Sequence, residues 1–406
     1  MVPNGWERHL VGKICSSIVP GRNKPKSFGG DIAWVTVPEI KSRYIPSNIQ
    51  ENYVSEDVIN ECGGKIVPEG AVVMSAVGDL GLVAITKEQV VLNQQLHAFV
   101  CSTKIDNEYL AYWLVTQKPL MESIASRTTI LYLNKSNCES IPVLVPPLPE
   151  QQKIAKILTS WDKAIDTTER LIDNSKQQKK ALMQQLLTGK KRLLDGNGKR
   201  FEGEWEEYKL KDVAKIIVSP VDKKTVEGEI PVELCNYTDV YYNIRITKSL
   251  DFMKATAKQS EIDRFTLQVD DVIITKDSET PEDIAVPALV SEDLNGVVCG
   301  YHLAIIRPNK DKVIGAFLNY LFATPKIGYY FFSLANGATR FGLTISSIEQ
   351  AQFKLPSLAE QQKISAVLTN ADKEIELLEQ QLADLQQEKK ALMQVLLTGK
   401  KRVRVD

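Results

Sequence analysis

Some side chains in this sequence belong to types that do chemistry in enzymes, but their spacing completes no catalytic signature. The segment 188–191, Thr-Gly-Lys-Lys, resembles the end of a phosphate-binding loop, yet the upstream glycine and the preceding strand are missing. Cys299 and His302 are close in sequence but lack the further ligands of a metal site, so we expect His302 in a buried apolar position. No nucleophile–base pair is evident. The sequence therefore predicts no catalytic residue and no metal ligand.

Basic and aromatic side chains instead gather in segments outside the helical patterns. Such side chains suit contacts with DNA phosphates and with base edges in the major groove. Taken singly, each cluster could equally be a solvated loop. However, Arg127 and Arg340 both precede the strand that leads into a repeated segment. Gln94 and Gln95 could read bases or could be structural. The DNA-binding candidates are Arg22, Lys24, Lys26, Lys41, Arg43, Arg127, Lys223, Lys224, Tyr241, Arg245, Lys276 and Arg340.

The elements that would position these side chains are organised by an internal duplication. Residues 148–154, Leu-Pro-Glu-Gln-Gln-Lys-Ile, recur as Leu-Ala-Glu-Gln-Gln-Lys-Ile at 358–364, and Leu-Leu-Thr-Gly-Lys-Lys-Arg occurs at both 186–192 and 396–402. The regions that precede the two copies share only a pattern. Variable and fixed segments therefore alternate, which suggests two related recognition tasks held in one geometry. We divide the chain into a first recognition domain (1–147), a first helix (148–192), a linker with a second recognition domain (193–357), and a second helix with a tail (358–406).

Each fixed segment has the pattern of one long helix. Glu150 and Glu360 fall in the first turn, where carboxylates interact favourably with the helix dipole, and Gly189 and Gly399 fall where a glycine ends a helix. About 40 residues at 1.5 Å each give a rod of roughly 60 Å. Apolar residues recur in steps of three and four, as in a coiled coil. The expected packing face comprises Ile154, Leu158, Trp161, Ile165, Ile172, Leu182, Leu186, Ile364, Leu368, Ile375, Leu378, Leu382, Leu385, Leu392 and Leu396.

A helix of this length cannot bury its apolar stripe alone. Each helix could pack on its own globular unit. The interpretation that we favour is that the two copies pack on each other, because like units usually pair through closed two-fold symmetry. That symmetry makes the helices antiparallel and predicts one variable unit at each end of the rod.

The variable units have an α/β pattern, with a mixed and curled sheet. The expected fold is therefore α/β, with two globular recognition domains related by pseudo-two-fold symmetry and separated by two long helices in an antiparallel coiled coil. In the first unit we expect strands at 33–37, 71–75, 82–86 and 90–100 and a helix at 107–125. In the second unit we expect strands at 271–276, 284–290 and 296–307 and a helix at 313–334.

The composition is that of an ordinary globular protein. The chain has 406 residues, of which 43% are hydrophobic and 25% charged, which excludes a largely disordered chain. Its 50 Lys and Arg balance 51 Asp and Glu, so net charge does not identify a polyanionic partner, although a local basic patch can exist. No apolar run reaches the roughly 18 residues needed to cross a bilayer. We therefore expect no membrane partner. Six scattered cysteines without a CxxC favour a reduced, cytoplasmic protein.

Several of these features together resemble the specificity subunit of Type I restriction–modification systems. They are the Val-Pro-Pro-Leu-Pro-Glu-Gln-Gln-Lys-Ile stretch at 145–154 with its second copy at 355–364, the paired Trp-Glu openings at 6–7 and 205–206, and Ala-Trp-Val at 33–35. The similarity covers nearly the whole chain. Ala359 departs from the pattern set by Pro149, and the second unit has Pro-Val-Glu at 231–233 where the first has Ala-Trp.

The resemblance implies a non-catalytic subunit that binds double-stranded DNA. Each recognition domain would read one half of a split target, and the helices would act as a spacer and dock two methyltransferase subunits. Restriction subunits would join through the methyltransferases. The chain itself would bind no cofactor, because S-adenosylmethionine, ATP and Mg²⁺ are expected in the partner subunits.

Two other interpretations stay open. A methyltransferase or nuclease would need a complete cofactor loop, which the sequence lacks. A coiled-coil scaffold with globular protein-binding ends, which binds no DNA, would show no sequence-dependent DNA affinity even when mixed with a methyltransferase partner.

Overall fold

The computed structural model describes residues 2–21, 23–46, 48, 50–127 and 130–405. The chain divides into unit 1, made of Met1–Glu169 and Gln380–Asp406, and unit 2, made of Arg170–Glu379. Two long helices, α6 (Leu148–Leu186) and α13 (Leu358–Leu396), each contribute one part to each unit. The sequence analysis divided the chain into four consecutive segments. The two units of the structure follow a different division, because each unit contains part of both long helices.

Unit 1 is a mixed α/β domain with two main sheets. One has the strand order β2-β10-β7-β8-β4 and the other β5-β3-β9-β6. Along β7, Val72 and Met74 belong to the core beneath the helices while Val73 belongs to the core between the sheets, as expected for a strand buried on both faces. Its elements are β1 (Glu7–Leu10), α1 (Val11–Ile14), β2 (Cys15–Ile18), β3 (Ile32–Val35), η1 (Val37–Glu39), β4 (Tyr44–Ile45), β5 (Asn52–Val54), α2 (Glu56–Cys62), β6 (Ile66–Val67), β7 (Val72–Ser75), β8 (Val83–Thr86), β9 (Val90–Leu92), β10 (Leu96–Cys101), α3 (Asn107–Thr116), α4 (Lys118–Ile124), β11 (Ser126–Arg127), β12 (Leu131–Tyr132), α5 (Lys135–Glu139) and β13 (Pro142–Val145).

Unit 2 repeats this plan with a smaller second sheet. Its five-stranded sheet has the order β15-β23-β19-β21-β17, and its three-stranded sheet has the order β18-β16-β22. Its elements are β14 (Glu206–Lys209), α7 (Leu210–Val213), β15 (Ala214–Val218), β16 (Ile230–Cys235), α8 (Tyr237–Tyr241), β17 (Arg245–Ile246), β18 (Met253–Ala257), α9 (Gln259–Phe265), β19 (Val272–Thr275), β20 (Asp277–Ser278), η2 (Pro281–Asp283), β21 (Pro287–Val290), β22 (Val298–Cys299), β23 (Leu303–Pro308), α10 (Gly315–Phe322), α11 (Pro325–Leu334), β24 (Phe341–Gly342), α12 (Ile345–Glu349) and β25 (Gln352–Leu355).

Four of the elements expected from sequence are each two elements in the structure. The helix expected at 107–125 is α3 and α4, and the helix expected at 313–334 is α10 and α11. Pro119 and Pro325 cause these breaks, because proline is accommodated in the first turn of a helix but cannot continue one. The strands expected at 90–100 and 296–307 are likewise divided, into β9 and β10 and into β22 and β23.

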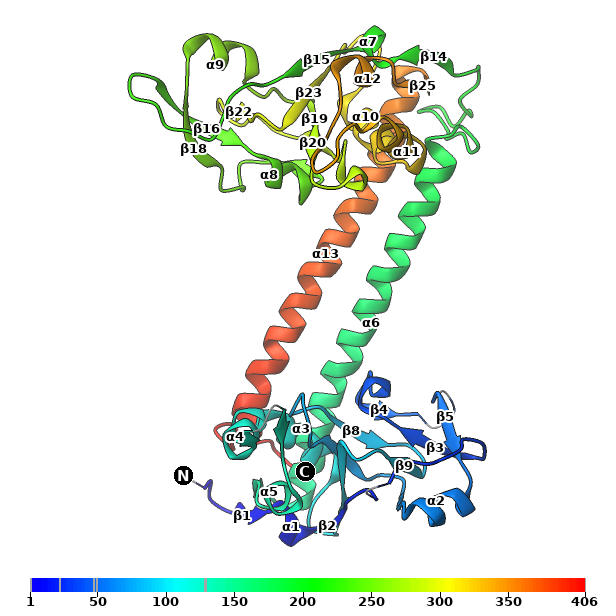
Figure 1. The fold of residues 1–406 in the computed structure, drawn as a ribbon, viewed down its shortest axis with the longest axis vertical. Helices are drawn as coiled ribbons and strands as arrows, with labels where there is room; N and C mark the ends of the chain where they lie inside the picture. The colour runs from blue at the N-terminus through cyan, green and yellow to red at the C-terminus, as the bar shows by residue number, and fades with distance from the viewer. Residues whose placement is uncertain (1, 22, 47, 49, 128–129, 406) are drawn as a thin grey trace. The chain divides into compact units, whose positions relative to one another are not determined.

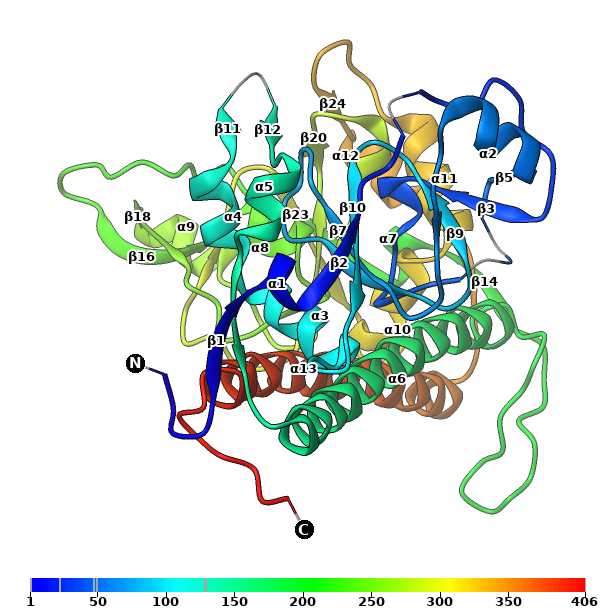
Figure 2. The same ribbon diagram turned by 90° about the horizontal axis from the view of Figure 1, so that it is seen from below.

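Within each unit, one end of α6 lies beside the opposite end of α13 (Figures 1 and 2). In unit 1, Ile154 and Leu158 of α6 share a core with Leu396 of α13, and in unit 2, Ile364 of α13 shares a core with Leu186 of α6. The helices therefore pack both on the globular part of a unit and on each other, which combines the two alternatives weighed from the sequence. The α/β class with paired antiparallel long helices is confirmed.

The expected packing face differs in burial along its length. Ile154, Leu158, Ile172, Leu186, Ile364, Leu368, Ile375 and Leu396 are buried. Trp161, Ile165, Leu182, Leu378, Leu382, Leu385 and Leu392 are half-buried.

Two lysines lie on the same helix faces as the apolar stripes, and each forms an ion pair with an aspartate of the other long helix. Lys179 of α6 forms an ion pair with Asp372 of α13 in unit 2, and Lys389 forms the equivalent pair with Asp162 in unit 1. Each aspartate also accepts a hydrogen bond from a tyrosine hydroxyl, which belongs to Tyr112 in unit 1 and to Tyr320 in unit 2. The same polar tie therefore occurs twice, and such ties can fix the register of a helix pair.

The repeated Glu-Gln-Gln motif joins the start of one long helix to the tail that follows the other. In unit 1, the buried Glu150 accepts two hydrogen bonds of 2.7 Å from Arg402 and one of 3.1 Å from Trp6 Nε1. In unit 2, the buried Glu360 accepts bonds of 2.6 and 2.7 Å from Arg192. These bidentate pairs explain why the fixed segments repeat both their first and their last residues.

Two kinds of feature are not found in the described part of the chain. None of its helices is both long and apolar enough to span a bilayer. Likewise, no group of three or more His, Cys, Asp or Glu side chains among the described residues is placed to hold a metal ion.

Candidate nucleic-acid interface

Three segments of unit 2 meet at one edge of its five-stranded sheet. Strands β19 and β23 are antiparallel neighbours, with Thr275 opposite Leu303, so residues just after β19 lie beside residues just before β23. The short strand β20 then pairs with β24, with Asp277 opposite Gly342. This topology brings Lys276 and Asp277, His302, and the loop that carries Arg340 together.

A chain of hydrogen bonds links these three segments. Arg340 Nη2 lies 3.1 Å from His302 Nε2, and His302 Nδ1 lies 3.2 Å from Asp277 Oδ2. An ionised carboxylate only accepts, so His302 donates from Nδ1, and its Nε2 is then the acceptor for Arg340. Lys276 Nζ lies 2.8 Å from both oxygens of Asp277. Asp277 is thus held between two donors, and Arg340 is fixed through His302.

These side chains border a hollow of about 450 Å³ that is rich in aromatic residues. Tyr237 and Tyr241 stack with ring centroids 5.5 Å apart, and the Tyr241 hydroxyl donates to Asp283 at 2.9 Å. Burial, followed by the charge of Asp283, raises the pKa of Tyr237 to about 12, so its phenol remains a donor at neutral pH. Lys223, Tyr301, His302 and Arg340 also line the hollow.

The arrangement suits contacts with base edges. An arginine can donate to guanine O6 and N7, a carboxylate can accept from cytosine N4, and tyrosine rings offer apolar contact with a donor at the tip. The hollow combines an arginine, carboxylates and tyrosine rings beside the edge of the five-stranded sheet. It can therefore support recognition of a base sequence as well as contact with a phosphate.

Unit 1 has the same construction with different side chains. Strands β7 and β10 pair with Ser75 opposite Leu96, and the Ala76 amide donates to the Gln95 carbonyl at 2.8 Å. In unit 2 the Lys276 amide donates to the His302 carbonyl at 2.9 Å, so Gln95 occupies the place of His302. The Gln95 side chain is exposed and its Oε1 accepts from Asn93 Nδ2 at 3.2 Å. Amide side chains of this kind suit adenine.

The structure brings some of the candidates in unit 2 together. Lys223, Tyr241 and Arg340 line the same hollow. Lys276 does not line it but forms an ion pair with Asp277, which does. Lys224 is exposed and pairs with Asp222 at 2.9 Å. The sequence analysis missed Asp277, and it expected His302 in an apolar position. His302 is instead 27% exposed and hydrogen-bonded on both ring nitrogens. One sequence signal could have placed His302 outside the core. It lies directly before the buried strand β23, where the turn that precedes a strand reaches the surface.

Two arginine candidates have acidic neighbours within their own units, and their contact with DNA stays a prediction. Arg43 is 15% exposed, donates to Glu108 Oε2 from Nε at 2.8 Å, and lies 3.4 Å from the ring centroid of Tyr112. Arg245 is 21% exposed and its Nη2 lies 3.7 Å from Asp372. Arg43 is therefore held by an acidic partner, whereas the buried Nη2 of Arg245 has an acidic neighbour but no hydrogen-bond partner among the described residues.

The other candidates of unit 1 are not gathered at one described site. Lys24, Lys26 and Lys41 are exposed in loops, and Arg127 lies in β11. Arg22 lies outside the described residues. Contact of these residues with DNA stays a prediction.

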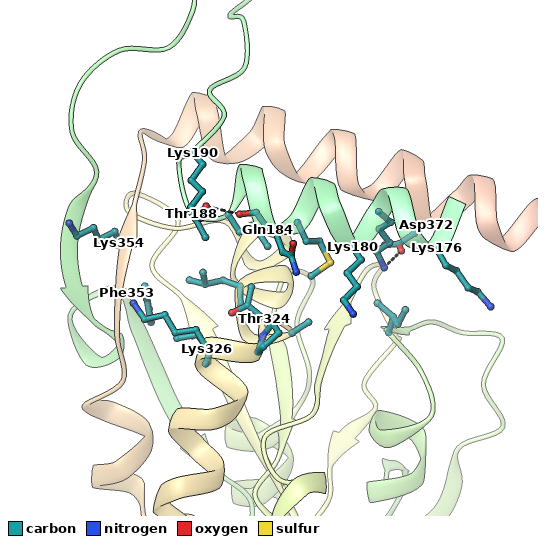
Figure 3. A pocket seen from close by; sticks show the side chains of 18 of the residues that line it. Lys176, Lys180, Gln184, Thr188, Lys190, Thr324, Lys326, Phe353, Lys354 and Asp372 are labelled. Atoms are coloured by element: carbon teal, nitrogen blue, oxygen red, sulfur yellow. Dashed lines mark hydrogen bonds and ion pairs between the residues drawn. The ribbon is translucent and has the colours of Figure 1, made fainter. Parts of the chain in front are cut away.

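A larger hollow of about 900 Å³ in unit 2 has a different character (Figure 3). It lies between the last turns of α6, the middle of α13, and the start of α11. Apolar side chains such as Met183, Leu187 and Ile327 line it. Its lysines are Lys176, Lys179, Lys180, Lys190, Lys326 and Lys354. The carboxylates of Glu207, Asp372, Glu376 and Glu379 also line it, so the hollow offers a protein partner apolar side chains beside charges of both signs.

Comparisons with known proteins agree with this construction. A family model described as the Type I restriction modification DNA specificity domain matches residues 3–176 and again 202–387. The putative type I restriction enzyme MjaX specificity subunit of Methanocaldococcus jannaschii is 30% identical over 328 residues, which cover 74% of this chain and 69% of that protein. The MjaVIII specificity subunit of the same organism is 22% identical, over 99% of this chain and 94% of that protein.

A solved structure has the same fold. The crystal structure of the Type I restriction–modification S subunit from M. genitalium superposes with a TM-score of 0.60 at 13% sequence identity, and the match covers 98% of this chain and 97% of that one.

Proposed function

Because this chain belongs to the Type I restriction–modification DNA specificity subunits, we propose that each of its two units reads one half of a split DNA sequence. The observation that carries the proposal is the duplicated sheet edge. The same backbone hydrogen bond presents Gln95 with Asn93 in unit 1 and His302 with Arg340 in unit 2. One scaffold with two sets of base-reading side chains is what two different half-sites require.

We further propose that α6 and α13 act as the spacer between the half-sites and dock two methyltransferase subunits. The lysine-lined hollow of unit 2 supports a docking role, because it places apolar side chains beside charges of both signs on the helices. Restriction subunits would join through the methyltransferases. The chain is then a non-catalytic subunit, and S-adenosylmethionine, ATP and Mg²⁺ act in its partners.

We also place the complex in the cytoplasm, together with the DNA that it modifies. All six cysteines lie in the described part of the chain and are free thiols, which is usual in a reducing compartment.

The decisive experiment is a methylation-site map of cells that carry this chain with its methyltransferase partner. We expect one two-part motif with a fixed gap, and a mobility shift of DNA that contains it in the presence of the partner. A coiled-coil scaffold without DNA affinity would give neither result. Substituting Met183→Asp in the lysine-lined hollow should reduce co-purification with the methyltransferase, while the exposed Lys199→Asp, which lies outside the hollow, serves as the control.

A further inference from the structure

We propose that Arg340 recognises a guanine in the half-site read by unit 2, and that His302 and Asp277 are positioning residues for its guanidinium. The inference rests on the proposed function and adds to it the side chain and the base. Four features of the structure support it, namely the closed loop, the free edge of the guanidinium, the charge balance and the neighbouring hollow.

The backbone around Arg340 forms a closed loop against Asp277. Asn336 and Gly342 exchange two backbone hydrogen bonds of 3.1 and 2.9 Å. A Cβ atom on Gly337, whose φ is +153°, would lie 1.8 Å from the Arg340 carbonyl oxygen. A Cβ atom on Gly342 would lie 2.9 Å from Asp277 Oδ1. Glycine is therefore needed at position 337 for Arg340 to reach this position, and a side chain at position 342 would displace the Asp277 carboxylate.

The guanidinium of Arg340 is positioned by one hydrogen bond, and its other N–H groups remain available as donors. Within the described part of the chain, His302 is its hydrogen-bond partner, and it holds one of the five N–H groups. The remaining edge can present two parallel donors, which is the geometry that guanine O6 and N7 accept. Fixing the side chain before DNA binds also reduces the conformational entropy lost on binding.

The charges around Arg340 keep it available for a base. Asp277 is 16% exposed and is neutralised by Lys276, which contacts both of its oxygens. His302 lies between this carboxylate and Arg340, so Asp277 orients the guanidinium without forming a direct ion pair with it. A direct pair would compete with the acceptors of a base.

The surroundings favour a base over a phosphate as the ligand of Arg340. Arg340 lies at the hollow formed by Tyr237, Tyr241 and Tyr301, whose flat rings suit base edges. The carboxylates of Glu279 and Asp283 line the same hollow and repel phosphate. Lys223, an exposed lysine at the rim of the same hollow, is placed to contact a phosphate instead.

Methylation-site maps of the full complex with Arg340→Ala and wild type test the proposal. We expect Arg340→Ala to relax one guanine position of one half-site by about 5- to 150-fold and to leave every other position unchanged. His302→Ala should relax the same position, and His302→Gln, which retains an acceptor, should partly restore it. Arg264→Ala removes an equally exposed charge from the same unit outside the hollow and should change no position.

The alternative outcomes are distinguishable. A uniform loss across all sequences, with a salt dependence lowered by about one phosphate contact, would identify Arg340 as a phosphate ligand and overturn the inference. If Arg340→Ala does not assemble with the partner, Arg340→Gln is used, because a glutamine amide suits adenine rather than guanine, and an unaltered guanine preference in that variant also overturns the inference. A wild-type complex without a two-part motif would instead refute the proposed function.

Discussion

His97 is a buried titratable residue in the core of unit 1. It lies on β10, is 2% exposed, and its ring centroid is 4.8 Å from that of Phe99. Its Nε2 has no hydrogen-bond partner among the described residues. Burial lowers the pKa of His97 to about 4, because the charged imidazolium loses its hydration there. The ring is therefore neutral in the folded protein at pH 7.

This burial predicts an acid-sensitive unit 1. Between the unfolded pKa near 6.5 and the folded pKa of about 4, the unfolded chain binds more protons, so stability is present above pH 6.5 and falls as the pH decreases. At pH 4.5 the loss from this residue should be about 2.5 kcal/mol. Urea unfolding at pH 7.5 and pH 4.5 measures it. In His97→Leu, the difference between the two pH values should shrink by that amount, and an equal pH dependence in both proteins would contradict the assignment.

Gln95 provides a residue-scale test of the first half-site. Its exposed amide stands where unit 2 has His302, and Asn93 holds it through Oε1. Gln95→Ala should relax one adenine position of the half-site opposite to the one changed by Arg340→Ala, by about 1–3 kcal/mol of discrimination. Gln89→Ala, another exposed glutamine of unit 1, is the matched control, and methylation-site mapping is the measurement. Relaxation within the half-site that Arg340 affects would refute the equivalence of the two edges.

At the scale of residues, the sequence showed which side chains have the chemistry to bind DNA, but not which of them are instead engaged within the fold. It identified Arg43 and Arg340 by the same reasoning, because both are basic residues in segments outside the helices. Arg43 contacts Glu108 and Tyr112, which lie far from it in sequence. Only the tertiary fold brings these three residues together. His302 was misjudged for the same reason, since its partner Asp277 follows a neighbouring strand.

At the scale of elements, the two polar ties between α6 and α13 differ in burial. The side chain of Asp372 is 4% exposed and that of Asp162 is 26% exposed, although both pair with a lysine and a tyrosine. Removing one partner of a buried pair leaves an uncompensated charge, whereas a partly exposed lysine is resolvated by water.

Asn substitution therefore separates the two ties. Asp372→Asn should lower the free energy of unfolding by about 3 kcal/mol, because Lys179 and Arg245 both lose their acidic partner in a buried place. Asp162→Asn should cost about 1 kcal/mol. Asparagine still accepts from the tyrosine, so the comparison isolates charge. Equal losses in thermal or urea unfolding would show that burial does not determine the strength of the tie.

The elements themselves followed from the sequence where repetition or periodicity was strong. The duplication located both long helices, and α6 and α13 begin at the equivalent residues Leu148 and Leu358. The sheets were found as separate short strands, but not their order, because strand order depends on contacts between distant segments. The divided strands β9 and β10, and β22 and β23, were each merged into one strand, although the polar residues Asn93 to Gln95 separate the two apolar runs in unit 1.

At the scale of the whole molecule, the proposed spacer depends on the spacing of the ties. The stretch from Asp162 to Lys179 in α6 has the same length as that from Asp372 to Lys389 in α13, so antiparallel helices can satisfy both ties at once. A heptad inserted into one helix alone would therefore disrupt a tie. Matched heptads, one in each helix between its aspartate and its lysine, would preserve both ties and continue the coiled-coil pattern.

The matched insertions should lengthen the gap in the DNA target and leave both half-sites unchanged. Seven helical residues add about 10 Å, which corresponds to about three base pairs at 3.4 Å each. Three base pairs also rotate the duplex by about 100°, whereas a heptad is close to two full helical turns, so modification of the new target should be weaker than that of the original. A methylation-site map measures the gap, and urea unfolding of the matched and the single insertions checks that only the single insertion loses stability. An unchanged gap in a stable, matched variant would mean that something other than these helices sets the spacing, because the half-site readers would then be independent of the length of α6 and α13.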